Sequence, residues 1–121
     1  MRRDFTYIDD VVEAVVRLIA RPPAGNPDWS GAAPDPATSR APWRLYNLGN
    51  SRPVDLTEFV RVLETVVGRP AIREFVPMQP GDVVETCADV TDLQDAVGFR
   101  PDTPIEEGLR HFVAWYRRYK R

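Results

Sequence analysis

A proline-rich segment divides this chain and limits the folds that are open to it. Six of the twelve prolines fall between residues 22 and 42, together with two glycines and many small polar residues. Proline fixes its own φ angle and lacks a backbone N–H donor, so neither a helix nor a central strand runs through such a stretch. We expect a long irregular loop over 22–42, a feature that is usually functional or disordered. Trp29 and Trp43, near its two ends, indicate that parts of the loop dock.

Length and composition indicate one globular domain and exclude several classes of protein. The 121 residues carry 16 Lys and Arg against 18 Asp and Glu, a net charge of −2, so no basic surface favours nucleic acid. The single cysteine excludes a disulfide within the chain, and the single histidine excludes a histidine-rich metal site. No apolar run reaches the roughly 20 residues that span a membrane. We expect a cytoplasmic protein without nucleic-acid or membrane partners.

Apolar periodicity predicts strands and helices in alternation around the loop. Residues that alternate between apolar and polar favour short strands, and apolar residues three and four positions apart favour helices. On this basis we expect strands over 3–8, 43–48 and 71–76, and helices over about 9–20 and 55–68. The order strand, helix, loop, strand, helix, strand favours an α/β arrangement over an all-α or an all-β fold.

Short polar residues and glycines mark the expected helix ends. Gly68 and Gly98 are suited to the left-handed conformation that closes a helix. A polar cap followed three residues later by Glu or Gln forms a capping box. The expected caps are Asp55 with Glu58, Thr91 with Gln94 in a short third helix, and Thr103 before Pro104 and Glu106 in a last helix.

No motif in the chain makes a catalytic site by itself. The phosphate-binding patterns G-x-G-x-x-G and G-x-x-x-x-G-K-[ST], the zinc pattern H-E-x-x-H and the nucleophile pattern G-x-S-x-G are all absent. The seven glycines are scattered singly along the chain. We therefore expect neither catalytic residues nor a metal ligand set here.

Three sequence blocks occur in order along nearly the whole chain. They are Arg-Asp-Phe-Thr-Tyr-Ile-Asp-Asp-Val-Val at 3–12, Tyr-Asn-Leu-Gly-Asn at 46–50 and Met-Gln-Pro-Gly-Asp-Val at 78–83. Asn-Pro-Asp-Trp at 26–29 lies in the loop before the second block. Together these blocks resemble the C-terminal third of extended short-chain dehydrogenase/reductases. Within that superfamily they are most similar to nucleotide-sugar epimerases of the UDP-glucuronate 4-epimerase branch.

The resemblance implies a two-lobed parent enzyme. In that family an N-terminal Rossmann lobe binds NAD and carries the catalytic Ser/Thr and Tyr-x-x-x-Lys, and a smaller C-terminal lobe binds the UDP-sugar. We therefore expect residues 1–121 to be the C-terminal, substrate-binding part, an α/β fragment of a Rossmann-type protein with short strands and about four helices. The N-terminal NAD-binding part, with its glycine fingerprint and catalytic block, is then missing, either by deliberate cutting or through a truncated gene.

The resemblance assigns substrate contacts to Arg3, Gln79 and Asp82. The arginine matching Arg3 contacts the diphosphate of the UDP-sugar, for which a guanidinium offers two parallel donors. The aspartate matching Asp82 accepts hydrogen bonds from the uridine ribose. Gln79 stands where the galactose branch has an arginine, and an uncharged donor there leaves phosphate binding more dependent on Arg3.

Simpler explanations exist for these residues and for other polar ones. Arg3 also suits an ion pair with a nearby acid such as Asp4, and Asp82 suits a turn after Pro80-Gly81. Four further features have a structural interpretation: Asp9 and Asp10 as first-turn residues opposing the helix dipole, His111 as a surface or boundary residue, Cys87 as a small buried hydrophobe, and the basic ending 117–121 as a solvated helix end.

Two classes of function remain open. The first is the UDP-sugar-binding segment of an NAD-dependent UDP-glucuronate 4-epimerase, inactive alone and without bound NAD, or the same part of a nucleotide-sugar dehydratase or decarboxylase. The second is a stand-alone interaction module that has lost nucleotide binding. Either way, a piece cut from its partner lobe exposes a strand edge and apolar helix faces, so we expect self-association or partial disorder.

Overall fold

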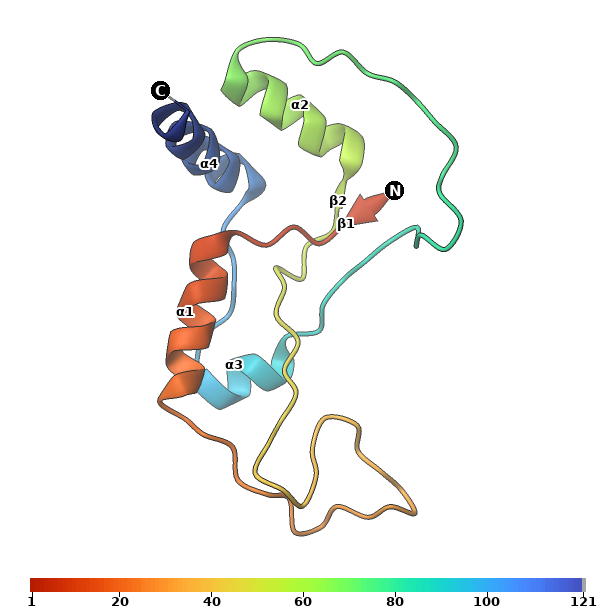
Figure 1. Cartoon of the computed structure of the whole chain (residues 1–121), viewed down its shortest axis with the longest axis vertical. Helices are drawn as coiled ribbons and strands as arrows, with labels where there is room; N and C mark the ends of the chain where they lie inside the picture. Colours follow the sequence, from red (N-terminus) through yellow and green to blue (C-terminus); the bar gives the residue numbers. More distant parts are fainter. Residues whose placement is uncertain (121) are drawn as a thin grey trace.

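The computed structural model describes residues 1–120, and over this range it contains four helices and one two-stranded sheet. The helices are α1 (Ile8–Ile19), α2 (Leu56–Val67), α3 (Thr91–Val97) and α4 (Ile105–Tyr119), and the strands are β1 (Arg2–Arg3) and β2 (Val54–Asp55). Figure 1 shows α1 and α3 in one half of an elongated molecule, α2 and α4 in the other, and the short sheet beside them. The proline-rich loop projects from the end that is farthest from α2 and α4.

One small core lies between α1 and α3. Ala14 and Leu93 are completely buried there, and Val97 is 5% exposed. Tyr46 and Leu48 pack against this cluster from the segment that follows the loop. The loop thus leaves α1 and returns to the core that α1 helps to form.

A second contact joins α2 to α4. Val62 of α2 and Leu109 and Val113 of α4 are buried, as expected for apolar residues that recur at helical spacing. The rings of Phe5 and Phe59 stack with centroids 4.2 Å apart, which ties the segment after β1 to α2. Gly108 lets α4 approach that segment, because a Cβ there would lie 3.2 Å from the Tyr7 ring.

The predicted helices are confirmed, but three of their predicted caps are not. Gly68 and Gly98 close α2 and α3 in the left-handed conformation, with φ of 81° and 64°. No side-chain cap forms at the N-terminus of α2, where Glu58 pairs with Arg61 instead of the backbone. In α3, Thr91 is already helical, and its N–H and hydroxyl donate to Asp89. The backbone N–H of Thr103, the predicted cap of α4, donates to Asp10.

The predicted strands are mostly wrong. Of 3–8 only Arg3 is in a strand, because β1 pairs antiparallel with β2 over two residues. Residues 43–48 contribute a single bridge, between Arg44 and Thr38, and 71–76 pair with no strand in the described part of the chain. A strand forms only where a neighbour accepts and donates its ladder hydrogen bonds. The fully exposed side chain of Ile72 marks a segment whose apolar residues meet no such neighbour.

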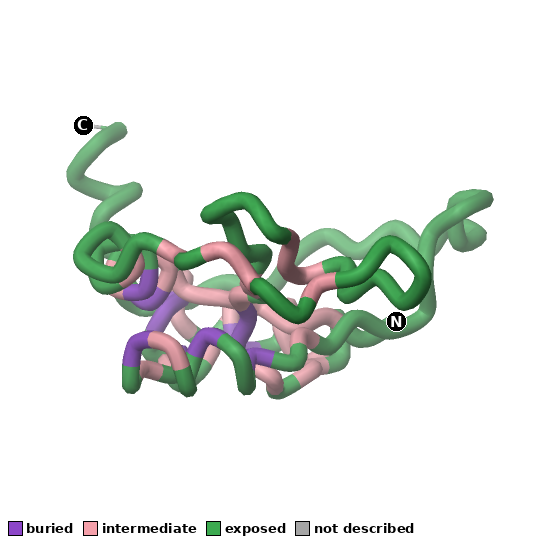
Figure 2. The backbone as a smooth tube through the Cα atoms, turned by 90° about the horizontal axis from the view of Figure 1, so that it is seen from below, coloured by how far each residue is buried: buried purple, intermediate pink, exposed green. Residues whose placement is uncertain are grey.

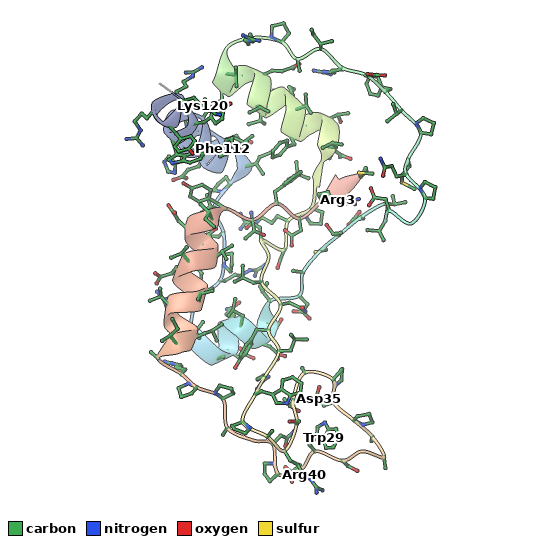
Figure 3. All side chains as sticks on the ribbon, in the orientation of Figure 1. Arg3, Trp29, Asp35, Arg40, Phe112 and Lys120 are labelled. Carbon is green, nitrogen blue, oxygen red and sulfur yellow. The ribbon has the colours of Figure 1, made fainter. Side chains whose placement is uncertain are left out.

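The proline-rich loop is ordered by its own hydrogen bonds. The Asn26 N–H donates to the Ser39 carbonyl oxygen at 2.7 Å, which brings the entry and exit of the loop together. Inside this closure the Trp29 indole N–H donates to the Asp35 carbonyl oxygen at 3.1 Å. Figure 3 shows Trp29, Asp35 and Arg40 gathered within the loop. Trp29 therefore docks inside the loop, whereas Trp43 is 44% exposed.

Large apolar side chains remain uncovered on α1. Its outer face carries five half-exposed or exposed aliphatic residues at helical spacing: Ile8, Val12, Val15, Val16 and Ile19. We call these five residues the α1 stripe. Figure 2 shows the buried residues gathered in one part of the molecule, at the lower left of the view, while most of the backbone is exposed. A stripe of this kind is typical of a helix that packs against a further layer.

Truncation of Leu93 tests the core between α1 and α3. Because Leu93 is completely buried, Leu93→Ala should lower the free energy of unfolding by about 3 kcal/mol through lost burial and a residual cavity. Urea unfolding followed by circular dichroism measures this change. Leu45→Ala is the matched control: Leu45 is 59% exposed, and its loss should change the free energy by less than about 0.5 kcal/mol. Equal effects of the two substitutions would contradict this core.

Asp35 should make the order of the loop dependent on pH. The backbone N–H of Ala37 and the hydroxyl of Thr38 donate to its carboxylate and hold the pKa of Asp35 below the ordinary 3.8. A lowered pKa stabilises the folded loop fully above the unfolded value, and this contribution is lost as the pH falls through the folded value. A carbon-detected NMR titration should therefore give a lower pKa for Asp35 in the native chain than in urea. Identical values would exclude this role.

Candidate functional site

The first residues of the chain run alongside residues 84–88. The Arg2 N–H donates to the Val84 carbonyl oxygen at 2.9 Å, and the Thr86 N–H donates back to the Arg2 carbonyl oxygen at 3.2 Å. The Asp4 N–H continues the pairing by donating to the Thr86 hydroxyl at 3.1 Å. Because β1 also pairs with β2 on its other side, Arg3 is held between two segments that are distant in sequence.

Arg3 and Asp82, both predicted to contact substrate, meet directly. One guanidinium nitrogen of Arg3 lies 2.5 Å from Asp82 Oδ1, and another donates to the Val83 carbonyl oxygen at 2.7 Å. The Arg3 side chain is 21% exposed and that of Asp82 is 39% exposed. The acid that pairs with Arg3 is therefore Asp82 and not Asp4, which has other partners.

A tight turn positions Asp82. The Asp82 N–H donates to the Gln79 carbonyl oxygen at 3.2 Å across Pro80 and Gly81, and Gly81 has a φ of 86°. Proline followed by a left-handed glycine is typical of a type II turn. Gln79 is exposed and begins this turn, so it lies at the same end of the 82–88 segment as Asp82.

The carboxylate of Asp4 accepts four backbone hydrogen bonds. Oδ1 accepts from Asn50 at 3.1 Å and from Arg52 at 3.3 Å. Oδ2 accepts from Ser51 at 3.0 Å and from Ala88 at 2.9 Å. The Asp4 side chain thus joins the first residues of the chain to two distant segments. These are the turn after residue 48 and the end of the 84–88 segment.

Sequence reasoning did not identify Asp4 and Asp10 as acceptors of backbone N–H groups from distant segments. Asp10 is 9% exposed, and its Oδ2 accepts the Thr103 N–H at 3.1 Å, which ties α1 to the segment before α4. The available signal was indirect: each aspartate lies next to apolar or aromatic residues that must be partly buried, where an acid needs donors.

Other polar residues lie away from Arg3. His111 packs against the Tyr7 ring with centroids 5.7 Å apart, in keeping with a boundary position. Burial and the Asp9 carboxylate raise the pKa of the Tyr7 hydroxyl above its ordinary 10.0. Cys87 is exposed, which corrects the expectation of a buried thiol, because residues 82–87 run along the surface.

The Tyr-x-x-x-Lys spacing does occur once, which corrects its expected absence. Tyr116 and Lys120 have this spacing at the end of α4, where the Lys120 N–H donates to the Tyr116 carbonyl oxygen in the final turn. Figure 3 places Lys120 at the far end of α4 from Arg3. Tyr116 and Lys120 therefore lie at an exposed helix end and do not adjoin Arg3 and Asp82.

The groups at this site differ in what they can donate and accept. A guanidinium beside a carboxylate offers strong donors for an anion and acceptors for hydroxyl groups. Within residues 1–120, no group of three or more His, Cys, Asp or Glu side chains is arranged to hold a metal ion. Over the same residues, no helix is long and apolar enough to cross a bilayer.

Known proteins match this chain over nearly its whole length. Protein CapI of Staphylococcus aureus is 50% identical over 119 residues, which are 98% of this chain and 36% of that protein. A probable UDP-glucuronate 4-epimerase of Rhizobium meliloti (strain 1021) is 46% identical over 126 residues, covering 100% of this chain and 36% of that protein. The chain therefore spans little more than a third of the length of these relatives. No family model matches it.

A solved structure shares the fold. MoeE5 in complex with UDP-glucuronic acid and NAD superimposes with a TM-score of 0.69 at 28% identity, over 96% of this chain and 33% of that one. The fold is accordingly α/β and corresponds to the matching part of Rossmann-type short-chain dehydrogenase/reductases. The chain corresponds to the C-terminal part of proteins of the NAD-dependent epimerase/dehydratase family, which include UDP-glucuronate 4-epimerases. The resemblance inferred from the three sequence blocks is confirmed.

Proposed function

We propose that this chain is the UDP-sugar-binding segment of an NAD-dependent UDP-glucuronate 4-epimerase, which interconverts UDP-glucuronate and UDP-galacturonate. The observation that carries the proposal is the meeting of Arg3 with Asp82, 79 residues apart in sequence. Two groups with complementary chemistry for a nucleoside diphosphate thus lie side by side on an accessible surface. Relatives named as UDP-glucuronate 4-epimerases support the choice of substrate.

Each residue has a separate role in this proposal. The Arg3 guanidinium binds the diphosphate with the N–H groups that are left free by its bonds to Asp82 and to the carbonyl oxygens of Arg2 and Val83. The Asp82 carboxylate accepts hydrogen bonds from the ribose hydroxyls. Gln79 donates to the same ligand without adding charge, so the affinity for phosphate depends mainly on Arg3.

We assign no NAD site and no catalytic group to this chain. NAD supplies hydride transfer at the sugar when it is bound in the parent enzyme. The glycine fingerprint that cradles its pyrophosphate is absent from residues 1–121, so these residues do not fit the cofactor. The chain alone, a cytoplasmic protein in this proposal, should bind substrate without converting it.

Binding of UDP-glucuronate tests the proposed contacts. Arg3→Ala should weaken binding at least about tenfold, because charge-assisted hydrogen bonds contribute roughly 1.5–3 kcal/mol each. Asp82→Asn should weaken it less, since an amide oxygen still accepts one bond. Isothermal titration calorimetry measures both. Arg100→Ala is the matched control: Arg100 is an exposed arginine in the segment between α3 and α4, and its loss should leave the affinity unchanged.

Two results would overturn this function. Failure of the unaltered chain to bind UDP or UDP-glucuronate at millimolar concentration would favour the interaction module over the substrate segment. Epimerisation by the pure chain with added NAD would show that catalytic groups had been overlooked.

We also propose that the isolated chain self-associates through the α1 stripe. Val16 is 56% exposed on this stripe, so Val16→Glu should disperse the oligomer by placing a charge in an apolar contact. Sedimentation equilibrium should show a mass that rises with concentration for the unaltered chain and stays monomeric for the variant. Thr65→Glu, on an exposed position of α2, is the control that should not change the mass. A compact monomer at all concentrations would contradict self-association.

A further inference from the structure

The Asp4 carboxylate has no capacity left for a ligand. An ionised carboxylate offers about four lone-pair positions, and here four backbone N–H groups occupy them, from Asn50, Ser51, Arg52 and Ala88. Its neighbour Arg3, in contrast, directs its side chain to an accessible surface. The Arg3 side chain therefore faces an accessible surface, whereas the Asp4 carboxylate binds the backbone of its own chain.

The chain closes tightly around this carboxylate. Ser51 has a φ of 55°, a left-handed conformation that a residue with a side chain rarely adopts. A Cβ on Gly49 would lie 2.6 Å from Asp4 Oδ2 and 2.4 Å from the Ala88 Cβ, so only glycine fits. Backbone strain of this kind persists where the surroundings enforce it. Here Ser51 is held by its N–H bond to Asp4 and by its hydroxyl bond to the Ala88 carbonyl oxygen.

Hydrogen bonds, and not burial, hold the segment that carries Asp82. Residues 82–87 are all exposed, so little apolar contact fixes them. Its middle is attached to the first residues by the backbone bonds of Arg2 with Val84 and Thr86. Its two ends are attached by the bonds of Asp82 with Arg3 and of Ala88 with Asp4. Release of the Asp4 end would leave the segment held mainly by its pairing with Arg2, so residues 82–88 would open more often and the spacing of Asp82 and Arg3 would be less fixed.

We propose that Asp4 is a positioning residue, which holds residues 82–88 against the start of the chain and thereby sets the spacing of Arg3 and Asp82 for a nucleoside diphosphate. This inference rests on the proposed function of those two residues. It assigns Asp4 no contact with substrate. Asparagine cannot replace it, because the amide has one acceptor atom and presents N–H donors to backbone N–H donors.

The experiment combines amide hydrogen exchange with a UDP-glucuronate titration, both followed by NMR on the full chain. In Asp4→Asn, exchange at Thr86 and Ala88 should accelerate at least tenfold, and the dissociation constant for UDP-glucuronate should rise at least tenfold. Exchange within α4 should stay unchanged, which reports that the rest of the chain is folded. Asp35→Asn is the matched control, since Asp35 also accepts a backbone N–H but lies in the proline-rich loop. It should alter neither measurement at the site.

A milder variant covers the case in which Asp4→Asn unfolds. Thr86 is exposed, and its hydroxyl accepts the Asp4 N–H. Thr86→Val removes only this hydroxyl, and it should weaken UDP-glucuronate binding severalfold. Unchanged exchange at Thr86 and Ala88 in Asp4→Asn would overturn the inference, as would faster exchange with unchanged affinity. If the unaltered chain binds no UDP-glucuronate, the proposed function fails, and the exchange measurement still decides whether Asp4 holds the segment.

Discussion

Carboxylates that accept backbone N–H groups connect the distant parts of this chain. Asp4 gathers the turn at 50–52 and Ala88, and Asp10 holds Thr103, 93 residues away in sequence. The apolar core between α1 and α3 is too small to fix all of these segments, because few side chains are fully buried. Hydrogen bonds to a charged acceptor are stronger than those between neutral groups, so a few such bonds set the arrangement of the connecting segments.

The accessible pair of Arg3 and Asp82 follows from that arrangement. Arg3 is placed by its neighbour Asp4 and by the two segments that flank β1, and Asp82 is placed by the turn at Pro80 and Gly81. The site therefore depends on connections and turns and not on a preformed cavity. This accords with the proposed function, in which this segment supplies contacts to only part of the UDP-sugar.

Local patterns predicted the helices well and the strands poorly. A helix forms its hydrogen bonds within itself, so the spacing of apolar residues in 9–20 and 55–68 was sufficient. A strand needs a neighbour. Of the two apolar segments, 43–48 forms only one isolated bridge, and 71–76 pairs with no strand in the described chain. The pairing of Arg3 with Asp82 could not be derived from spacing, since no local rule links residues 79 positions apart. Their separate identification came from the resemblance of the three blocks.

The closure of the proline-rich loop has a consequence for how such chains can vary. Asn26 and Ser39 meet at its neck, and the bonds of Trp29 and Asp35 lie beyond that neck. Residues inserted between positions 30 and 34 would leave this neck in place, together with the bonds that join Ala37 and Thr38 to the return segment. The entropy of closing a loop also grows only slowly with its length. The loop is thus a place where the size and chemistry of the molecule can be altered while the arrangement of the helices stays the same.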